Sequence, residues 1–187
     1  MVCRSLFIFG IGLALASPLS AAEPSPFQGI PRLKFEYYDV EGRTPAEIYA
    51  SMRARAPRSG DGEGMARTAW SIKVGWRESR SGSRCLVASP QAILSITILL
   101  PRLVTRSVTP QGLAFWRRSR QGLEIHEAGH ARIAYDHRGD FEEAARDAGC
   151  DSISRLAQQT QARVAALQEA YDRETRHGMT QIPAAAP

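Results

Sequence analysis

The sequence predicts an α+β protein in which a small antiparallel β-sheet packs against helices. Strand signals lie in the first half of the 187 residues, where β-branched and aromatic residues alternate with polar ones. Helix signals lie in the second half, where apolar residues recur at helical spacing between glycine and proline boundaries. A chain of this length has room for one domain with a real core, and no internal repeat divides it. We therefore place a single domain at residues 33–180.

The alternation of side chains locates the strands. From Arg67 to Trp76, apolar residues fall on one face and polar residues on the other, as in a half-buried strand. Pro90 is expected to bend the chain or to lie at a sheet edge. A loop is expected at residues 59–64 and a polar turn at 78–83. The predicted strands are residues 33–40, 67–76, 85–87 and 93–100.

Capping residues locate the helices. Thr44 and Glu47 can form a capping box around Pro45, which predicts a helix start. Gly122 is a candidate kink in the longest helix, and Gly178 is placed to cap the last one. The predicted helices are residues 45–56, 111–137, 140–148 and 153–176.

The first 22 residues have the features of a secretory signal peptide. Arg4 precedes an apolar run at residues 5–16, and small residues lead to a cleavage position after Ala22. The run is too short to span a bilayer comfortably, which disfavours an uncleaved anchor. We therefore expect export, with no stable membrane insertion after cleavage. Residues 23–32 are expected to form an extended lead-in, and residues 181–187 a disordered tail.

Cysteine usage agrees with export. Cleavage would remove Cys3 and leave Cys85 and Cys150, an even pair that an oxidising compartment should join. We expect a Cys85–Cys150 disulfide; the alternative is two buried free thiols. Oxidised sulfurs cannot bind a metal as thiolates, so these residues are poor zinc ligands.

The charge pattern argues against a nucleic-acid partner. The formal net charge is +5, and it comes almost wholly from scattered arginines. No basic block is interleaved with aromatic residues, so we expect a solvated surface and no nucleic-acid binding.

The segment that carries chemistry is His126-Glu127-Ala128-Gly129-His130, an H-E-x-x-H pattern. Residues four apart lie on one face of a helix, so His126 and His130 can direct two imidazoles at one Zn²⁺ ion. Glu127 can hold the metal-bound water and take its proton. The alternative is a surface helix with two solvated histidines. The pattern predicts a zincin-like active-site helix.

A catalytic zinc normally has a third protein ligand. His177 ranks first among the candidates because it follows the last helix and precedes Gly178, which permits a sharp turn. Asp136 ranks second, and His137 or Glu142 follow. Side chains expected beside the ligands, or near a reacting oxyanion, are Tyr171, Asp172, Thr175 and Arg176.

Several of these segments together resemble one family. They include Tyr37-Tyr38-Asp39-Val40, His126-Glu127-x-Gly129-His130, Tyr171-Asp172-x-x-Thr175-x-His177-Gly178, and both Cys85 and Cys150. This pattern resembles the bacterial predicted secreted zinc-dependent proteases, a domain of unknown function numbered nine-two-two. The resemblance implies that His177 belongs to the active site, and it supports the pairing of the two cysteines.

The sequence therefore predicts an exported bacterial zinc metallopeptidase, periplasmic or secreted, that acts on a peptide or protein. Glu127 is its expected general base, and His126, His130 and His177 its expected zinc ligands. Two alternatives remain: a zinc amidase that acts on cell-wall peptides, and a non-catalytic envelope binding module on a zincin scaffold. The oligomeric state is not predicted.

Overall fold

The computed structural model describes residues 24–56 and 64–183. The predicted signal peptide, most of the loop predicted at 59–64 and the last four residues of the predicted tail lie outside this part of the chain. None of the helices in the described part is long and apolar enough to cross a membrane. The elements are β1 (Leu33–Val40), α1 (Pro45–Arg55), β2 (Arg67–Ser81), β3 (Arg84–Leu103), α2 (Pro110–Asp136), α3 (Asp140–Ala144), α4 (Cys150–Thr175) and a short 3-10 helix η1 (Met179–Gln181).

The three strands form a mixed sheet in the order β1-β3-β2. β2 and β3 are antiparallel, as predicted, and Trp70 lies opposite Ile96. β1 is parallel to β3, with Leu33 beside Ile96, so the prediction of a purely antiparallel sheet is wrong. The physical reason is that a period of two identifies a strand but does not fix its direction. The chain passes through α1 and β2 between β1 and β3, and a connection of this length permits the two strands to pair in parallel.

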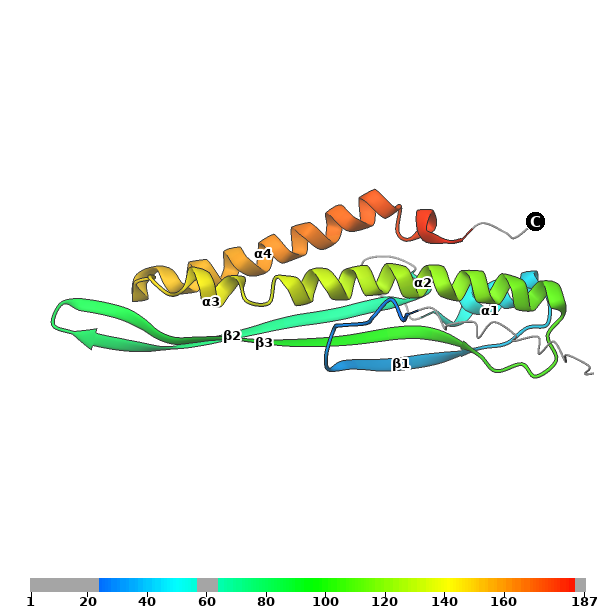
Figure 1. The fold of residues 1–187 in the computed structure, drawn as a ribbon, viewed down its shortest axis with the longest axis horizontal. Helices are drawn as coiled ribbons and strands as arrows, with labels where there is room; N and C mark the ends of the chain where they lie inside the picture. The colour runs from blue at the N-terminus through cyan, green and yellow to red at the C-terminus, as the bar shows by residue number, and fades with distance from the viewer. Residues whose placement is uncertain (1–23, 57–63, 184–187) are drawn as a thin grey trace, which may run out of the picture.

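β2 and β3 form a hairpin that is longer than predicted and extends past the end of β1 (Figure 1). The strands pair out to Ser81 and Arg84, so the reversal is confined to the two residues between them. Pro90 lies within β3 and does not end it. The register shifts nearby, between Gly75 and Arg77, and Ser89 has a φ of 50°. This irregularity accommodates a residue that cannot donate to the strand ladder.

The helices cover one face of the sheet, and α2 lies closest to it (Figure 1). Ile96, Ile98 and Leu100 of β3 are buried against α2, which contributes alanines to this contact. Small side chains let the helix approach the strands closely. The alanines in this cluster are Ala128, Ala131 and Ala134. Their side of α2 faces the sheet, which leaves His126 and His130 directed away from the sheet.

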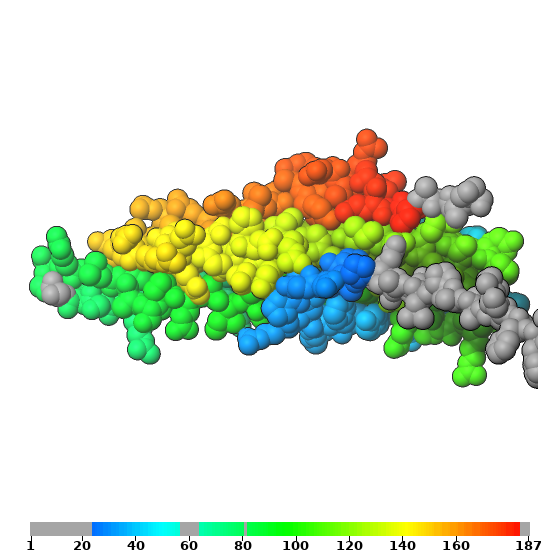
Figure 2. All heavy atoms as spheres, in the orientation of Figure 1, coloured from blue at the N-terminus to red at the C-terminus, as the bar shows by residue number. Residues whose placement is uncertain are grey.

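The described part of the lead-in is ordered. Residues 26–29 form a turn, and Phe27 and Ile30 are buried in the same cluster as α2 and β3. Arg132 of α2 donates to the carbonyl of Gln28 at 2.7 Å. Figure 2 shows this segment, in blue, lying against the yellow-green surface of α2. The lead-in therefore contributes to the core beneath the motif helix.

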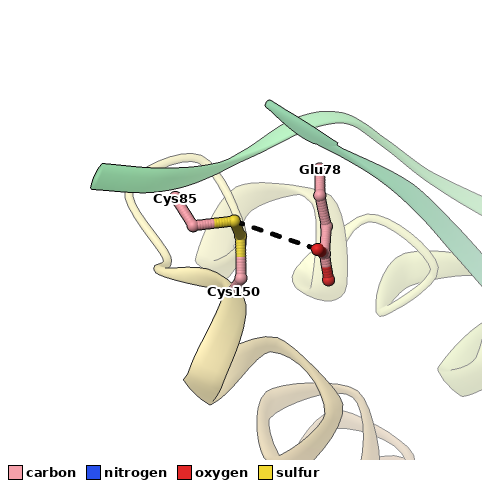
Figure 3. A group of neighbouring side chains, drawn as sticks. All are labelled: Glu78, Cys85 and Cys150. Atoms are coloured by element: carbon pink, nitrogen blue, oxygen red, sulfur yellow. Dashed lines mark hydrogen bonds between the residues drawn. A yellow bond between two sulfur atoms is a disulfide. The ribbon is translucent and has the colours of Figure 1, made fainter. Parts of the chain in front are cut away.

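The predicted disulfide is confirmed. Cys85 near the start of β3 is bonded to Cys150, the first residue of α4, with the two Cα atoms 5.6 Å apart (Figure 3). An isolated bridge between Leu86 and Gly149 holds the same two segments together. The N-terminus of α4 is therefore fixed to the hairpin.

Candidate metal centre

The motif helix meets the C-terminal half of α4 at the two histidines. His126 is 7% exposed, and His130 is partly buried. The facing side of α4 carries Gln168, Tyr171 and Asp172, whose spacing places them on one helix face. The site is thus assembled from two helices that are joined through α3.

Three atoms converge between these helices. His126 Nε2 lies 3.2 Å from Asp172 Oδ1, and His130 Nε2 lies 3.1 Å from the same oxygen. The two Nε2 atoms are 3.2 Å apart. The side chains of His126, His130 and Asp172 are therefore close enough together to hold one metal ion.

The other nitrogen of each imidazole is held by a glutamine. Gln168 donates its Nε2 to the carbonyl of His130 at 3.1 Å and places its Oε1 against His130 Nδ1. Gln181 donates its Nε2 to the Tyr171 hydroxyl at 2.8 Å and places its Oε1 3.0 Å from His126 Nδ1. An amide oxygen only accepts, so each of these contacts is a hydrogen bond when the Nδ1 atom carries the ring hydrogen. Both Nε2 lone pairs then face the Asp172 carboxylate.

Three acceptor atoms that face one another could hold a metal ion between them, and their spacing is compatible with a small divalent ion. Donors bound at about 2.0–2.2 Å to one tetrahedral zinc lie roughly 3.3–3.5 Å apart, close to the observed triangle. Burial first, and then the neighbouring His130, lower the pKa of His126. The lowered pKa favours the neutral ring, which has the lone pair that a metal needs.

Glu127 lies beside this group, in the contact between α2 and the sheet. It is 3% exposed, and the hydroxyl of Thr68 in β2 donates to its Oε2 at 2.7 Å. Burial raises the pKa of Glu127 to about 7, although the hydrogen bond from Thr68 lowers it. A carboxyl group with this pKa can both accept and return a proton at neutral pH.

Tyr171 fills the space beside both imidazoles. Its ring is stacked on His126, with centroids 5.3 Å apart, and meets the edge of His130 at 5.0 Å. Gly129 makes this possible, because a Cβ at that position would overlap the Tyr171 hydroxyl. Burial raises the pKa of Tyr171. Tyr171 therefore lies beside both histidines, and its expected role beside the ligands or at an oxyanion stays a prediction.

The chain reverses sharply after α4. Arg176, His177 and Gly178 have φ values of 50°, 53° and 81°. The reversal brings Gly178 against His126, where an added Cβ would lie 3.0 Å from the imidazole Cγ. Thr175 Oγ1 lies 3.4 Å from His126 Nδ1 and donates to the Tyr171 carbonyl at 2.8 Å. Thr175 is thus also close to His126, and its expected role beside a ligand stays a prediction.

His177 lies at the outer edge of the site. Its side chain is 81% exposed, and its Nδ1 is 3.6 Å from Asp172 Oδ1. It is not one of the three converging residues, and its role as a ligand stays a prediction. The lower-ranked candidates have partners elsewhere: Asp136 approaches Arg132, His137 contacts Asp140, and Glu142 accepts from the Ala92 amide.

The sequence profile described as "Bacterial protein of unknown function (DUF922)" matches residues 35–178. The chain belongs to the DUF922 family. No curated protein and no solved structure matches it. The matched region of this DUF922 chain contains the three converging residues, Glu127 and the disulfide, and it ends at Gly178.

Sequence reasoning placed Asp172 beside the expected ligands and missed that it lies with His126 and His130 in one group that could hold a metal ion. Gln168 was also missed, although it precedes Asp172 by one helical turn and that spacing could have revealed it. Thr68 and Gln181 gave no local signal, because β2 and the segment after α4 supply them. Gln181 was expected to begin the disordered tail; it lies in η1 and contacts His126.

A second close group in the described residues joins Glu78 to the two bonded cysteines (Figure 3). The Glu78 carboxylate lies 3.9 Å from Cys85 Sγ. Because both sulfurs are in the disulfide, neither can donate as a thiolate, and this group of the DUF922 chain is not a metal centre while oxidised.

Proposed function

We propose that this DUF922 protein is an exported zinc-dependent metallopeptidase. The observation that carries the proposal is the convergence of His126 Nε2, His130 Nε2 and Asp172 Oδ1 within 3.2 Å of one another. The Nδ1 atom of each imidazole contacts a glutamine Oε1. Histidines that bind metals usually donate the hydrogen of the second ring nitrogen to an oxygen acceptor in this way. Two imidazoles and a carboxylate form a ligand set that suits catalytic zinc.

When bound, zinc would polarise the substrate carbonyl and lower the pKa of a water molecule. Glu127 takes the proton from the attacking water and delivers it to the leaving amine. The hydroxyl of Thr68 fixes one oxygen of Glu127, and burial tunes its pKa toward neutrality. Tyr171 keeps the two imidazoles in place by filling the space beside them.

His177 is a further ligand candidate in this proposal. Its Nδ1 lies 3.6 Å from Asp172 Oδ1, so a side-chain rotation would bring it within reach of the same ion, but its side chain is 81% exposed. Asp172 is the preferred third ligand because its carboxylate already touches both Nε2 atoms. The disulfide supports export, since such bonds persist in oxidising compartments.

The test begins with metal content. The purified, disulfide-bonded chain should contain one zinc ion, as measured by mass spectrometry. Asp172→Ala should lose it, whereas Glu169→Ala, a matched change of a side chain that is 74% exposed on the same helix, should retain it. Loss in His177→Ala with retention in Asp172→Ala would instead make His177 the third ligand. Absence of zinc after reconstitution of the unmodified chain would reject the proposal.

Activity separates the candidate reactions. We expect hydrolysis of an unfolded protein such as casein, and Glu127→Gln should abolish it while zinc remains bound. Cleavage of peptidoglycan peptides without cleavage of proteins would indicate the cell-wall amidase. A zinc-loaded chain that cleaves neither would be consistent with the binding module.

A further inference from the structure

The two histidines of the candidate metal centre are oriented by different parts of the fold. The glutamine behind His130 belongs to α4, the helix that also carries Asp172. Gln168 is 7% exposed and bonds to both the ring and the carbonyl of His130. The orientation of His130 is therefore built into the packing of α2 against α4.

The orientation of His126 depends on residues that follow α4 in the chain. Gln181 lies in η1, three residues past the end of the DUF922 match. Its Nε2 is committed to the Tyr171 hydroxyl at 2.8 Å, so its Oε1 is the atom that faces His126 Nδ1. An oxygen at that point stabilises the Nδ1–H tautomer, which keeps the lone pair on Nε2.

The position of Gln181 is fixed by the reversal of the chain. Thr180 Oγ1 donates to the Thr175 carbonyl at 3.1 Å, which holds η1 against the end of α4. Gly122 of α2 contacts Ile182 so closely that a Cβ would lie 2.9 Å from the Ile182 Cα. α2 runs through Gly122 as one helix from Pro110 to Asp136. Because Gly122 has no side chain, the segment after α4 can pack directly against α2 at this point.

We propose that the segment at residues 178–182 is a positioning element of the metal centre, in which Gln181 sets the tautomer and orientation of His126. The inference rests on the proposed function for its zinc readout but has a second readout that needs no metal. Gln181 is a positioning residue: it touches the back of a ligand and not the ion. It lies outside the region that the family profile matches.

The affinity experiment compares three variants. Gln181→Leu keeps the size of the side chain and removes the acceptor, so zinc affinity should fall by about 10- to 100-fold. Gln181→Glu keeps an acceptor oxygen and should restore affinity at least to that of the unmodified chain. Glu169→Ala changes a side chain on α4, outside this segment, that is 74% exposed and should have no effect. Zinc affinity is measured by competition with a chelator of known affinity.

The second readout is the tautomer itself. In metal-free protein at about pH 8, where an ordinary imidazole is neutral, ring ¹⁵N NMR should show His126 with its hydrogen on Nδ1. Gln181→Leu should shift His126 toward the Nε2–H form and leave His130 unchanged, because Gln168 still holds it. Gln181→Glu should keep the Nδ1–H form.

Three outcomes would overturn the inference. One is a Gln181→Leu variant with unchanged tautomer and unchanged affinity. Another is a Gln181→Glu variant that loses as much affinity as Gln181→Leu, because the oxygen would then not matter. The third is an Nε2–H ring in the unmodified chain. If the unmodified chain binds no zinc, the proposed function fails, and the tautomer measurement alone decides the role of Gln181.

Discussion

Replacing Gly129 by alanine tests whether Tyr171 is the reason for a glycine between the two histidines. The added methyl group would overlap the hydroxyl and the ζ-carbon of Tyr171, so the phenol ring must move. That ring lies against both imidazoles. The substitution therefore disturbs the packing of the site without touching a ligand.

The expected magnitude combines two opposing effects. Overpacking costs about 1–3 kcal/mol, while alanine in a helix interior is favoured over glycine by about 1 kcal/mol. Gly129→Ala should therefore lower the free energy of unfolding by up to about 2 kcal/mol. Zinc affinity should fall as well, because His126 loses the ring stacked on it.

The assay is urea unfolding in two backgrounds, with the disulfide intact. In a Tyr171→Ala background the obstructing ring is absent, so Gly129→Ala should become stabilising by about 1 kcal/mol through helix propensity alone. The change of sign is the diagnostic result. Equal destabilisation in both backgrounds would refute the contact with Tyr171 as the reason for this glycine.

Three further predictions concern other parts of the site and the fold. Thr68→Val removes the hydrogen bond that lowers the pKa of Glu127, so the pKa should rise and the acidic limb of the pH–activity profile should move to higher pH; an unmoved limb would exclude this bond as a control of the base. Cys85→Ser with Cys150→Ser opens a loop with a sequence separation of 65 and should cost about 4 kcal/mol in the chain-entropy model, measured by urea unfolding. Zinc affinity should persist in that variant, because Asp172 lies about 33 Å along α4 from Cys150. Adding zinc at 100 times its Kd should stabilise the metal-free chain by about 2.7 kcal/mol, and Asp172→Ala should abolish this gain in thermal unfolding.

Local rules predicted most of the fold. The capping box of Thr44 and Glu47 is present at the start of α1, and the strand predicted at residues 33–40 has the observed bounds. Ile72 faces the core as the alternation requires. The direction of β1 was missed because partner and polarity are decided by distant residues. The length of β3 was missed because a bulge in the hairpin absorbs Pro90.

The residues of the candidate site that lie close together in the sequence were predicted, and those that other elements supply were missed. His126, Glu127 and His130 follow from one motif on one helix. The choice between His177 and Asp172 depends on the backbone after α4. Gly178 predicted one left-handed residue there, whereas Arg176 and His177 also adopt that conformation. The reversal exposes His177 and leaves Asp172, on the regular part of the helix, facing the two imidazoles.

The strand order also bears on how quickly the protein can fold. β3 is the central strand and the partner of β1. Leu33 of β1 pairs with Ile96, which lies 63 residues later in the chain, so β1 cannot pair until that part of the chain is present. Such distant parallel pairing carries a high loop-closure entropy and forms slowly. A slowly closing sheet keeps a newly made chain unfolded for longer, which suits passage through a membrane before folding. If the chain is exported as proposed, the disulfide between the hairpin and α4 would form after the membrane is crossed and would fix an arrangement that the unfolded chain lacked.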